Sequence, residues 1–268
     1  MFIAALLSAV IIGVSLGLIG GGGSILTVPV FVYMLGITPV LATAYSLFVV
    51  GSTSLVGSIA FMKKGLVNYK AAIVFAIPSF ISVYLTRLYI IPAIPDEIFS
   101  IGNFVVSKDM AIMAFFALIM LAASISMIKK KKNGAGDEQT EVTPKFNFPM
   151  IALEGAFVGV LTGIVGAGGG FLIIPALVLL ARIPMKMAVG TSLLIISAKS
   201  LIGFLGDVQN QPIDWTFLLI FTSISIVGII LGSFLSKKIS GEKLKAGFGY
   251  FVLIMAVYIL ASEIIKAS

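Results

Sequence analysis

The side chain with the clearest chemical potential in this sequence is a lysine inside an apolar segment. Lys199 lies about 13 residues into the segment 186–206 and has no charged residue within seven positions on either side. A charge this deep in an apolar helix is costly, and it normally faces the bundle interior or a water-filled cavity. There its ammonium group would attract and hold an anion. The alternative is a structural ion pair with Glu154 or Asp207.

Hydroxyl groups recur at matched positions in two apolar segments. Tyr45 and Ser46 correspond to Thr191 and Ser192, and Ser192 shares a helix face with Lys199 at a spacing of seven residues. Hydroxyls in membrane helices often bond only a carbonyl of their own helix, and this is the alternative here. Their repeated placement makes Ser46, Thr191 and Ser192 candidates for binding the same anion.

Two glycine-rich turns are the strongest local signal. Residues 20–23 (GGGG) and 166–170 (GAGGG) each separate two apolar segments, and we expect a helix to start directly after each turn. Free backbone N–H groups at a helix start carry the positive end of the helix dipole and bind anions. The candidate donors are the N–H groups of Gly22, Gly23, Ser24, Gly169, Gly170 and Phe171. The alternative is that glycines serve tight helix crossings, as we expect for Gly13 and Gly17.

Two further charged residues lie in apolar segments. Arg87, near the end of 70–92, is expected to extend its guanidinium group to the membrane surface. Glu154 lies about two turns into 148–165. It is either a proton-coupling carboxylate or a residue of the headgroup zone, and we favour the headgroup zone.

The composition places the chain in a membrane. Of its 268 residues, 59% are hydrophobic and 11% are charged, whereas soluble domains carry roughly 25% charged residues. Without Cys or His, the sequence offers no thiolate nucleophile, disulfide, iron–sulfur cluster or imidazole metal site. We therefore expect no enzyme, no metal and no cofactor. We ascribe the net charge of +7 to orientation in the membrane and not to nucleic-acid binding.

The chain consists of two copies of one unit. Residues 13–75 align without a gap to residues 159–221, at an offset of 146. Chance similarity between two apolar sequences would match Leu and Val, but it would not place glycines, prolines and serines in one register. The matched pairs include Gly17/Gly163, Gly20/Gly166, Gly22/Gly168, Pro29/Pro175, Ser46/Ser192 and Ser54/Ser200.

Each copy contains five apolar segments that predict helices. They cover 2–19, 24–36, 39–62, 70–92 and 108–128 in the first copy, and 148–165, 171–181, 186–206, 213–236 and 245–265 in the second. The second segment of each copy is too short to span a bilayer, which takes about 20 residues. We therefore expect each copy to open with a glycine-linked helical hairpin, followed by three long transmembrane helices.

Loop charges set the expected topology. The positive-inside rule places the lysine-rich linker 129–147 in the cytoplasm. If each hairpin returns to the side that it left, the basic loops 63–70 and 237–245 are cytoplasmic as well, and both termini are extracytoplasmic. The fold class is then an all-α polytopic membrane protein built as an inverted-topology repeat, with repeats at 1–128 and 148–268. The hairpins either cross fully or re-enter.

These motifs resemble the TauE/SafE-type sulfite exporter family, also described as the four-toluene-sulfonate uptake family. The resemblance rests on GLIGGGGSILTVPVF with ATAYSL in the first copy, and on GIVGAGGGFLIIPALVLL with AVGTSLLIISAKSLIGF in the second. It covers nearly the whole chain. It implies a carrier in the bacterial inner membrane for sulfite, sulfonates or other sulfur-containing organic anions. The site is asymmetric, because Tyr45 and Thr53 stand where the second copy has Thr191 and Lys199.

The expected function is therefore secondary transport of a small sulfur-containing anion across the inner membrane. The alternative is a carrier or channel for another small anion, such as a carboxylate. A scaffold without a ligand and an enzyme acting on lipid are weaker alternatives. We expect a small anionic substrate, a coupling ion (proton or sodium), contact with membrane lipid and no nucleic acid. Oligomerisation is compatible with the sequence.

Overall fold

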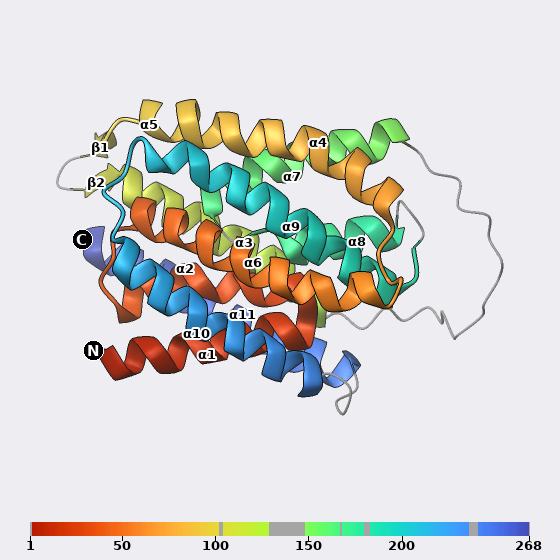
Figure 1. Cartoon of the computed structure of the whole chain (residues 1–268). Helices are drawn as coiled ribbons and strands as arrows, with labels where there is room; N and C mark the ends of the chain where they lie inside the picture. Colours follow the sequence, from red (N-terminus) through yellow and green to blue (C-terminus); the bar gives the residue numbers. More distant parts are fainter. Residues whose placement is uncertain are drawn as a thin grey trace.

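The computed structural model describes residues 2–101, 104–128, 148–166, 168–179, 183–235 and 241–267, and it forms a bundle of helices (Figure 1). The first half comprises α1 (Phe2–Ile19), the 3₁₀ helix η1 (Gly20–Leu26), α2 (Thr27–Pro29), the π-helix η2 (Val30–Met34), α3 (Pro39–Lys63), α4 (Tyr69–Leu85), the π-helix η3 (Thr86–Ile90), α5 (Ile91–Ala93), β1 (Glu97–Ile101), β2 (Phe104–Ser107) and α6 (Lys108–Ile128). The second half comprises α7 (Phe148–Val165), α8 (Gly170–Leu179), α9 (Met185–Val208), α10 (Trp215–Leu235) and α11 (Gly241–Ala267). The predicted linker 129–147 lies outside the described residues.

Five of the described helical stretches are long and apolar enough to cross a membrane. They are Pro39–Lys63, Tyr69–Ala93, Lys108–Ile125, Lys186–Val208 and Trp215–Leu235. The arms of the two hairpins, Ala5–Leu18, Gly23–Met34 and Pro149–Val165, form shorter apolar helices. The predicted all-α polytopic membrane fold is thereby confirmed, and most helix ends lie within a few residues of the predicted ones.

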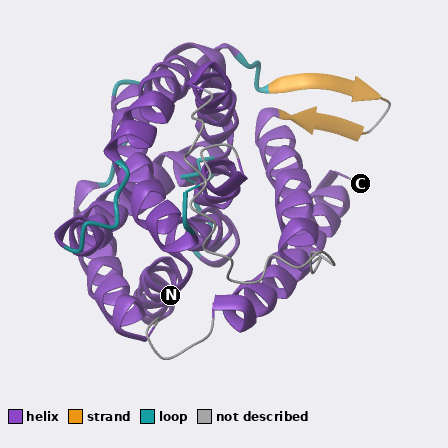
Figure 2. Ribbon diagram, turned by 90° about the vertical axis from the view of Figure 1, so that its right-hand side faces the viewer, coloured by secondary structure: helices purple, strands orange, loops and turns teal. Residues whose placement is uncertain are grey.

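One element differs from the expected helices. Strands β1 and β2 form an antiparallel pair between α5 and α6, with Glu97 opposite Ser107 and Ile101 opposite Phe104. The pair projects beside the helices (Figure 2). The sequence contains a signal for it, because Gly-Asn at 102–103 joins two short runs that are rich in β-branched and aromatic residues.

Each helix in the following four pairs packs on a helix of the other half. Helix α3 packs on α9 and α6 packs on α11, whereas α1 packs on α10 and α7 packs on α4. We call α1/α10 and α7/α4 the exchanged pairs, because each joins helices that are not counterparts in the repeat. Helix α1 starts at the end of the bundle that holds both termini, whereas α7 starts at the opposite end (Figure 1). Corresponding helices therefore run in opposite directions. An inverted repeat requires this arrangement, and its orientation in a membrane stays a prediction.

The contacts of the exchanged pairs keep the register of the sequence alignment. A Cβ at Gly13 would meet the backbone of Ser225, and a Cβ at Gly159 would meet the backbone of Ser79. Gly13 and Gly159 differ by 146 positions, as do Ser79 and Ser225. The offset seen in 13–75 therefore continues into α4 and α10. The small residues allow the two backbones to touch, as the alternative interpretation of Gly13 expected.

The tight crossing predicts that Gly13→Ala destabilises the fold. The added Cβ would lie against the Ser225 carbonyl oxygen and 2.8 Å from the Gly228 Cα, so α10 would have to move away. Overpacking of this kind costs about 1–3 kcal/mol. Thermal unfolding in detergent measures the loss. Ile11→Ala is the control, because Ile11 lies on the same helix and is 60% exposed. An unchanged melting temperature for Gly13→Ala would contradict the crossing.

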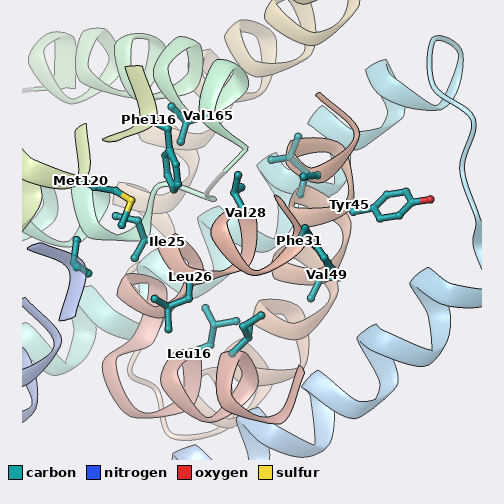
Figure 3. Packing of buried hydrophobic residues seen from close by; sticks show 14 of the residues in the cluster. Leu16, Ile25, Leu26, Val28, Phe31, Tyr45, Val49, Phe116, Met120 and Val165 are labelled. Carbon is teal, nitrogen blue, oxygen red and sulfur yellow. The ribbon is translucent and has the colours of Figure 1, made fainter. Parts of the chain in front are cut away.

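The returning arm of the first hairpin lies at the centre of the larger apolar cluster. Ile25, Val28 and Phe31 are buried there against Leu16 of α1 and Val49 of α3 (Figure 3). A 3₁₀ or irregular segment at membrane depth is tolerated only where protein or a water-filled cavity surrounds it. The surrounding long helices supply that enclosure for the glycine turns.

Candidate functional site

The two glycine turns meet inside the bundle. A Cβ built on Gly170 would collide with the backbone of Gly21, and one built on Gly21 would lie 2.6 Å from the Gly170 Cα. The chain reverses through glycines with positive φ, at Gly20 in the first turn and at Gly166, Gly168 and Gly169 in the second. Only glycine adopts such angles without cost, and only glycine permits the two backbones to touch.

The turns reach far along the long helices. Gly20 lies against Val189, five residues into α9, and Gly166 lies against Thr43, five residues into α3. Five residues of helix span about 7 Å. Each hairpin therefore turns back about 7 Å short of the end at which the neighbouring helix starts. The two contacts are again related by the 146-residue offset.

The first turn differs locally from the expectation. We expected a helix start at Ser24, whereas η1 already begins at Gly20 and is a 3₁₀ helix. In the second turn α8 starts at Gly170, as expected. Its first bonds run from the Leu172 and Ile173 N–H groups to the Gly169 carbonyl, at 3.0 and 3.1 Å. The N–H groups of Gly170 and Phe171 stand ahead of these, where a helix has no internal acceptor.

Lys199 lies at this second turn. Its side chain is 0% exposed, and its Nζ donates a hydrogen bond to the Thr162 Oγ1 at 2.9 Å. A Cβ on Gly169 would lie 2.8 Å from the same Nζ, so the turn passes directly beside the ammonium group. Within the described chain neither Glu154 nor Asp207 pairs with Lys199, because its one hydrogen bond goes to Thr162. An ammonium group has three N–H donors, and Thr162 takes one of them.

The structure brings part of the predicted site together. The second turn holds Gly169 and Gly170, with Lys199 beside them. Ser24 also lies at this turn, because a Cβ added to Gly168 would stand 3.3 Å from the Ser24 Cβ. Gly23 instead packs against Ser15 and Leu16 of α1. Gly22 lies within η1, and Phe171 lies in the first turn of α8.

The predicted hydroxyl ligands Ser46, Ser192 and Thr191 differ in their hydrogen bonds. The Ser46 Oγ is buried without a hydrogen-bond partner among the described residues. The Ser192 Oγ donates to the Val189 carbonyl at 2.8 Å, so for Ser192 the local hydrogen bond, our alternative, is the one the structure has. The hydroxyl of Ser24, whose backbone N–H was the predicted donor, likewise donates to the Gly21 carbonyl at 2.7 Å.

Thr191 joins the two halves of the chain. Its Oγ1 accepts a hydrogen bond from the Asn68 N–H at 2.9 Å, at the start of α4. The matched Tyr45 Oη accepts from the Asp214 N–H at 2.8 Å, at the start of α10. These bonds tie the start of each partner helix to α9 or α3. The contact of Thr191 with a ligand stays a prediction.

Sequence reasoning missed a second buried polar cluster. Arg87 was expected to reach the membrane surface, and this expectation is wrong, because the side chain is 0% exposed. Its Nη1 lies 2.8 Å from the Thr43 Oγ1 and 3.5 Å from the Asp207 Oδ1. Asp207 directly follows the predicted segment 186–206, and it is buried near the end of α9. The available signal was an arginine inside one apolar segment and an aspartate at the end of another, which the fold could pair.

Residues 5–259 match the family described as Sulfite exporter TauE/SafE. A protein of Xylella fastidiosa named "Probable membrane transporter protein" is 30% identical over 253 residues, covering 93% of this chain and 91% of that protein. "Probable membrane transporter protein YunE" of Bacillus subtilis is 29% identical, covering 88% and 89%. No solved structure matches the chain. The apolar helices and the duplicated glycine turns agree with these matches. The chain therefore belongs to the TauE/SafE sulfite exporter family of membrane transporters.

Proposed function

We propose that this chain is a secondary transporter that carries a small sulfur-containing oxyanion, sulfite or a sulfonate, across the inner membrane. The observation that carries the proposal is Lys199, a fully buried ammonium group at the second glycine turn with no carboxylate partner in the described chain. A buried charge without a counter-charge is costly unless a ligand supplies one. The choice of a sulfur-containing substrate rests on the description of the family as sulfite exporters.

The binding position lies where the turns meet. The N–H groups that open α8, at Gly170 and Phe171, carry the positive end of the helix dipole. Lys199 adds a full positive charge beside them. An oxyanion held there would accept hydrogen bonds from the helix start and from the ammonium group. Ser46 has a buried hydroxyl without a partner in the described chain, so it is the predicted hydroxyl that keeps its hydrogen bond for a ligand.

Transport would follow from movement of one half against the other. The exchanged helix pairs and the antiparallel course of α1 and α7 support an inverted repeat, the architecture that alternating access commonly uses. Both termini would be extracytoplasmic and the linker 129–147 cytoplasmic, as the lysine-rich loops indicate. Because the sequence contains no GxxxxGK[ST] motif, a gradient of protons or sodium would drive the cycle.

Ligand-induced thermal stabilisation tests the proposal. Detergent-purified protein is heated with sulfite, sulfate, thiosulfate, sulfoacetate, taurine, an aromatic sulfonate and matched carboxylates, at constant ionic strength. A ligand that binds the folded state adds about 2.7 kcal/mol to the free energy of unfolding at a concentration of 100 times Kd, and it thereby raises the melting temperature. We expect one sulfur oxyanion to stabilise the protein and Lys199→Ala to remove the effect.

Two outcomes would change the assignment. A shift with a carboxylate and none with any sulfur compound would keep the anion site but reject the sulfur substrate. A sulfur anion that stabilises Lys199→Ala as much as the original chain would remove Lys199 from the site.

A further inference from the structure

A second buried cation lies outside the site around Lys199. Arg87 is 0% exposed within η3, and Asp207, 2% exposed on α9, is its counter-charge. The pair is joined by one contact, 3.5 Å from Nη1 to Oδ1, at the long limit of a hydrogen bond. A well-formed arginine–carboxylate pair uses two parallel N–H groups at shorter distance. This pair is therefore poorly satisfied.

The cluster leaves several polar atoms without partners. Among the described residues, Arg87 Nε and Nη2 and Asp207 Oδ2 have no hydrogen-bond partner. The neighbouring Thr86 Oγ1 is also buried and unpartnered. Buried polar groups are normally satisfied, and a buried ion pair stabilises only when its remaining lone pairs and protons are bonded too. A planar guanidinium with two unpartnered nitrogens, Nε and Nη2, can donate hydrogen bonds to a second oxyanion.

The end of α7 and the glycine that follows it connect this cluster to Lys199. Thr162 contacts Lys199, and Gly166, four residues later, lies against Thr43, which bonds Arg87. Along α9, Lys199 and Asp207 are separated by eight residues, about 12 Å of helix. The π-turn η3, which carries Arg87, leads directly into α5, and α5 lies at the end of the bundle that holds both termini (Figure 1).

The local backbone also distinguishes this position. Arg87 stands in the π-turn Thr86–Ile90, whereas α10 is regular helix through Leu235 at the matched positions of the second half. Single π-turns within helices often occur at functional sites. Gly206 lies directly against Arg87, with its Cβ position 3.0 Å from the Arg87 Cβ, so α9 packs closely on the turn.

We propose that Arg87 is a second anion-binding position on the transport path, and that Asp207 occupies it in this conformation. An oxyanion leaving or approaching Lys199 would displace the Asp207 carboxylate and take the guanidinium fork. Asp207 thereby competes with the anion for the Arg87 guanidinium group, and it closes this end of the path when no anion is present. The inference rests on the proposed anion transport, but it concerns a separate set of residues.

The test removes the Asp207 carboxylate from a chain in which Lys199 has already been replaced. The chain Lys199→Met/Asp207→Asn is titrated with sulfite and sulfate, with gluconate holding the ionic strength constant, and the melting temperature is followed. Loss of the close counter-charge should make an anion-dependent rise in melting temperature appear at concentrations at least tenfold lower than any at which Lys199→Met alone responds. The matched control adds Arg87→Gln, which leaves a neutral pair of similar shape and should abolish the shift.

Two results overturn the inference. They are the absence of an anion-dependent shift in Lys199→Met/Asp207→Asn, and a shift that persists after Arg87→Gln. If Asp207→Asn fails to fold, the neutral pair Arg87→Gln/Asp207→Asn is assayed for transport. The inference predicts that transport is lost there, and a purely structural pair predicts that it is retained. Failure of the proposed function is recognised separately, as a shift in the original chain that does not depend on Lys199.

Discussion

Replacing Lys199 by Met should greatly weaken anion transport while the protein folds at least as stably as before. The ammonium group is fully buried with only the Thr162 hydroxyl as partner, so the charge itself is costly to the fold. Methionine fills a similar volume without a charge. A hydrogen bond to a charged group contributes about 1.5–3 kcal/mol, so its loss lowers anion affinity by roughly tenfold to 100-fold. Uptake into proteoliposomes and thermal unfolding without ligand measure the two effects.

The control for this substitution lies on the same helix. Lys186 is exposed at the start of α9, and Lys186→Met removes the same charge without touching the turns. We expect it to transport normally. The two effects of Lys199→Met should have opposite signs, with stability rising and transport falling. A variant that melts earlier and transports normally would show that Lys199 serves only the fold.

Adding one methyl group at Gly169 should also slow transport strongly. Gly169 has φ +70°, where an L side chain costs about 1–2 kcal/mol. The new Cβ would in addition meet the Thr162 side chain and lie 2.8 Å from the Lys199 Nζ. The methyl group would therefore displace the ammonium group from its partner and block the helix start beside it. We expect at least a tenfold loss of transport rate, as for loss of one charge-assisted hydrogen bond.

Two other glycines separate backbone strain from the effect on the site. Gly36 has φ +68° and Gly65 has φ +67°, and an added Cβ at either meets nothing within 4 Å. Gly36→Ala and Gly65→Ala therefore carry the same strain as Gly169→Ala without its collisions. We expect both to lose stability slightly and to keep transport. Equal loss of transport in all three variants would contradict a site at Gly169.

The positions of the helices could be predicted because they depend on local composition. Long apolar runs, such as 39–62 and 186–206, have few ways to satisfy their backbone in a membrane except as helices. Glycines and loop charges then mark where the chain turns. The β pair before α6 was missed because its strands have only 5 and 4 residues, well short of the apolar runs that predict helices, although Gly-Asn at 102–103 marks the turn between them.

The candidate site could be predicted only in part. Lys199 and the two turns were found because an isolated charge and a repeated glycine run are visible in one dimension. Thr162 was not found, because its role depends on α7 lying across α9 at one particular register. The assignment of Thr191 and Ser192 as ligands remains a prediction, since each already has a hydrogen bond within the protein.

The sequence by itself determined the membrane class, the duplicated unit, most helix ends to within a few residues and the places of the two glycine turns. Each of these follows from hydropathy or from repeated residue types, which act locally along the chain. Only the tertiary structure decided that the turns touch through Gly21 and Gly170, and that Asp207 pairs with Arg87 and not with Lys199. Those contacts join helices far apart in the sequence. Their geometry is set by how closely small residues let the helices cross, which no single segment specifies.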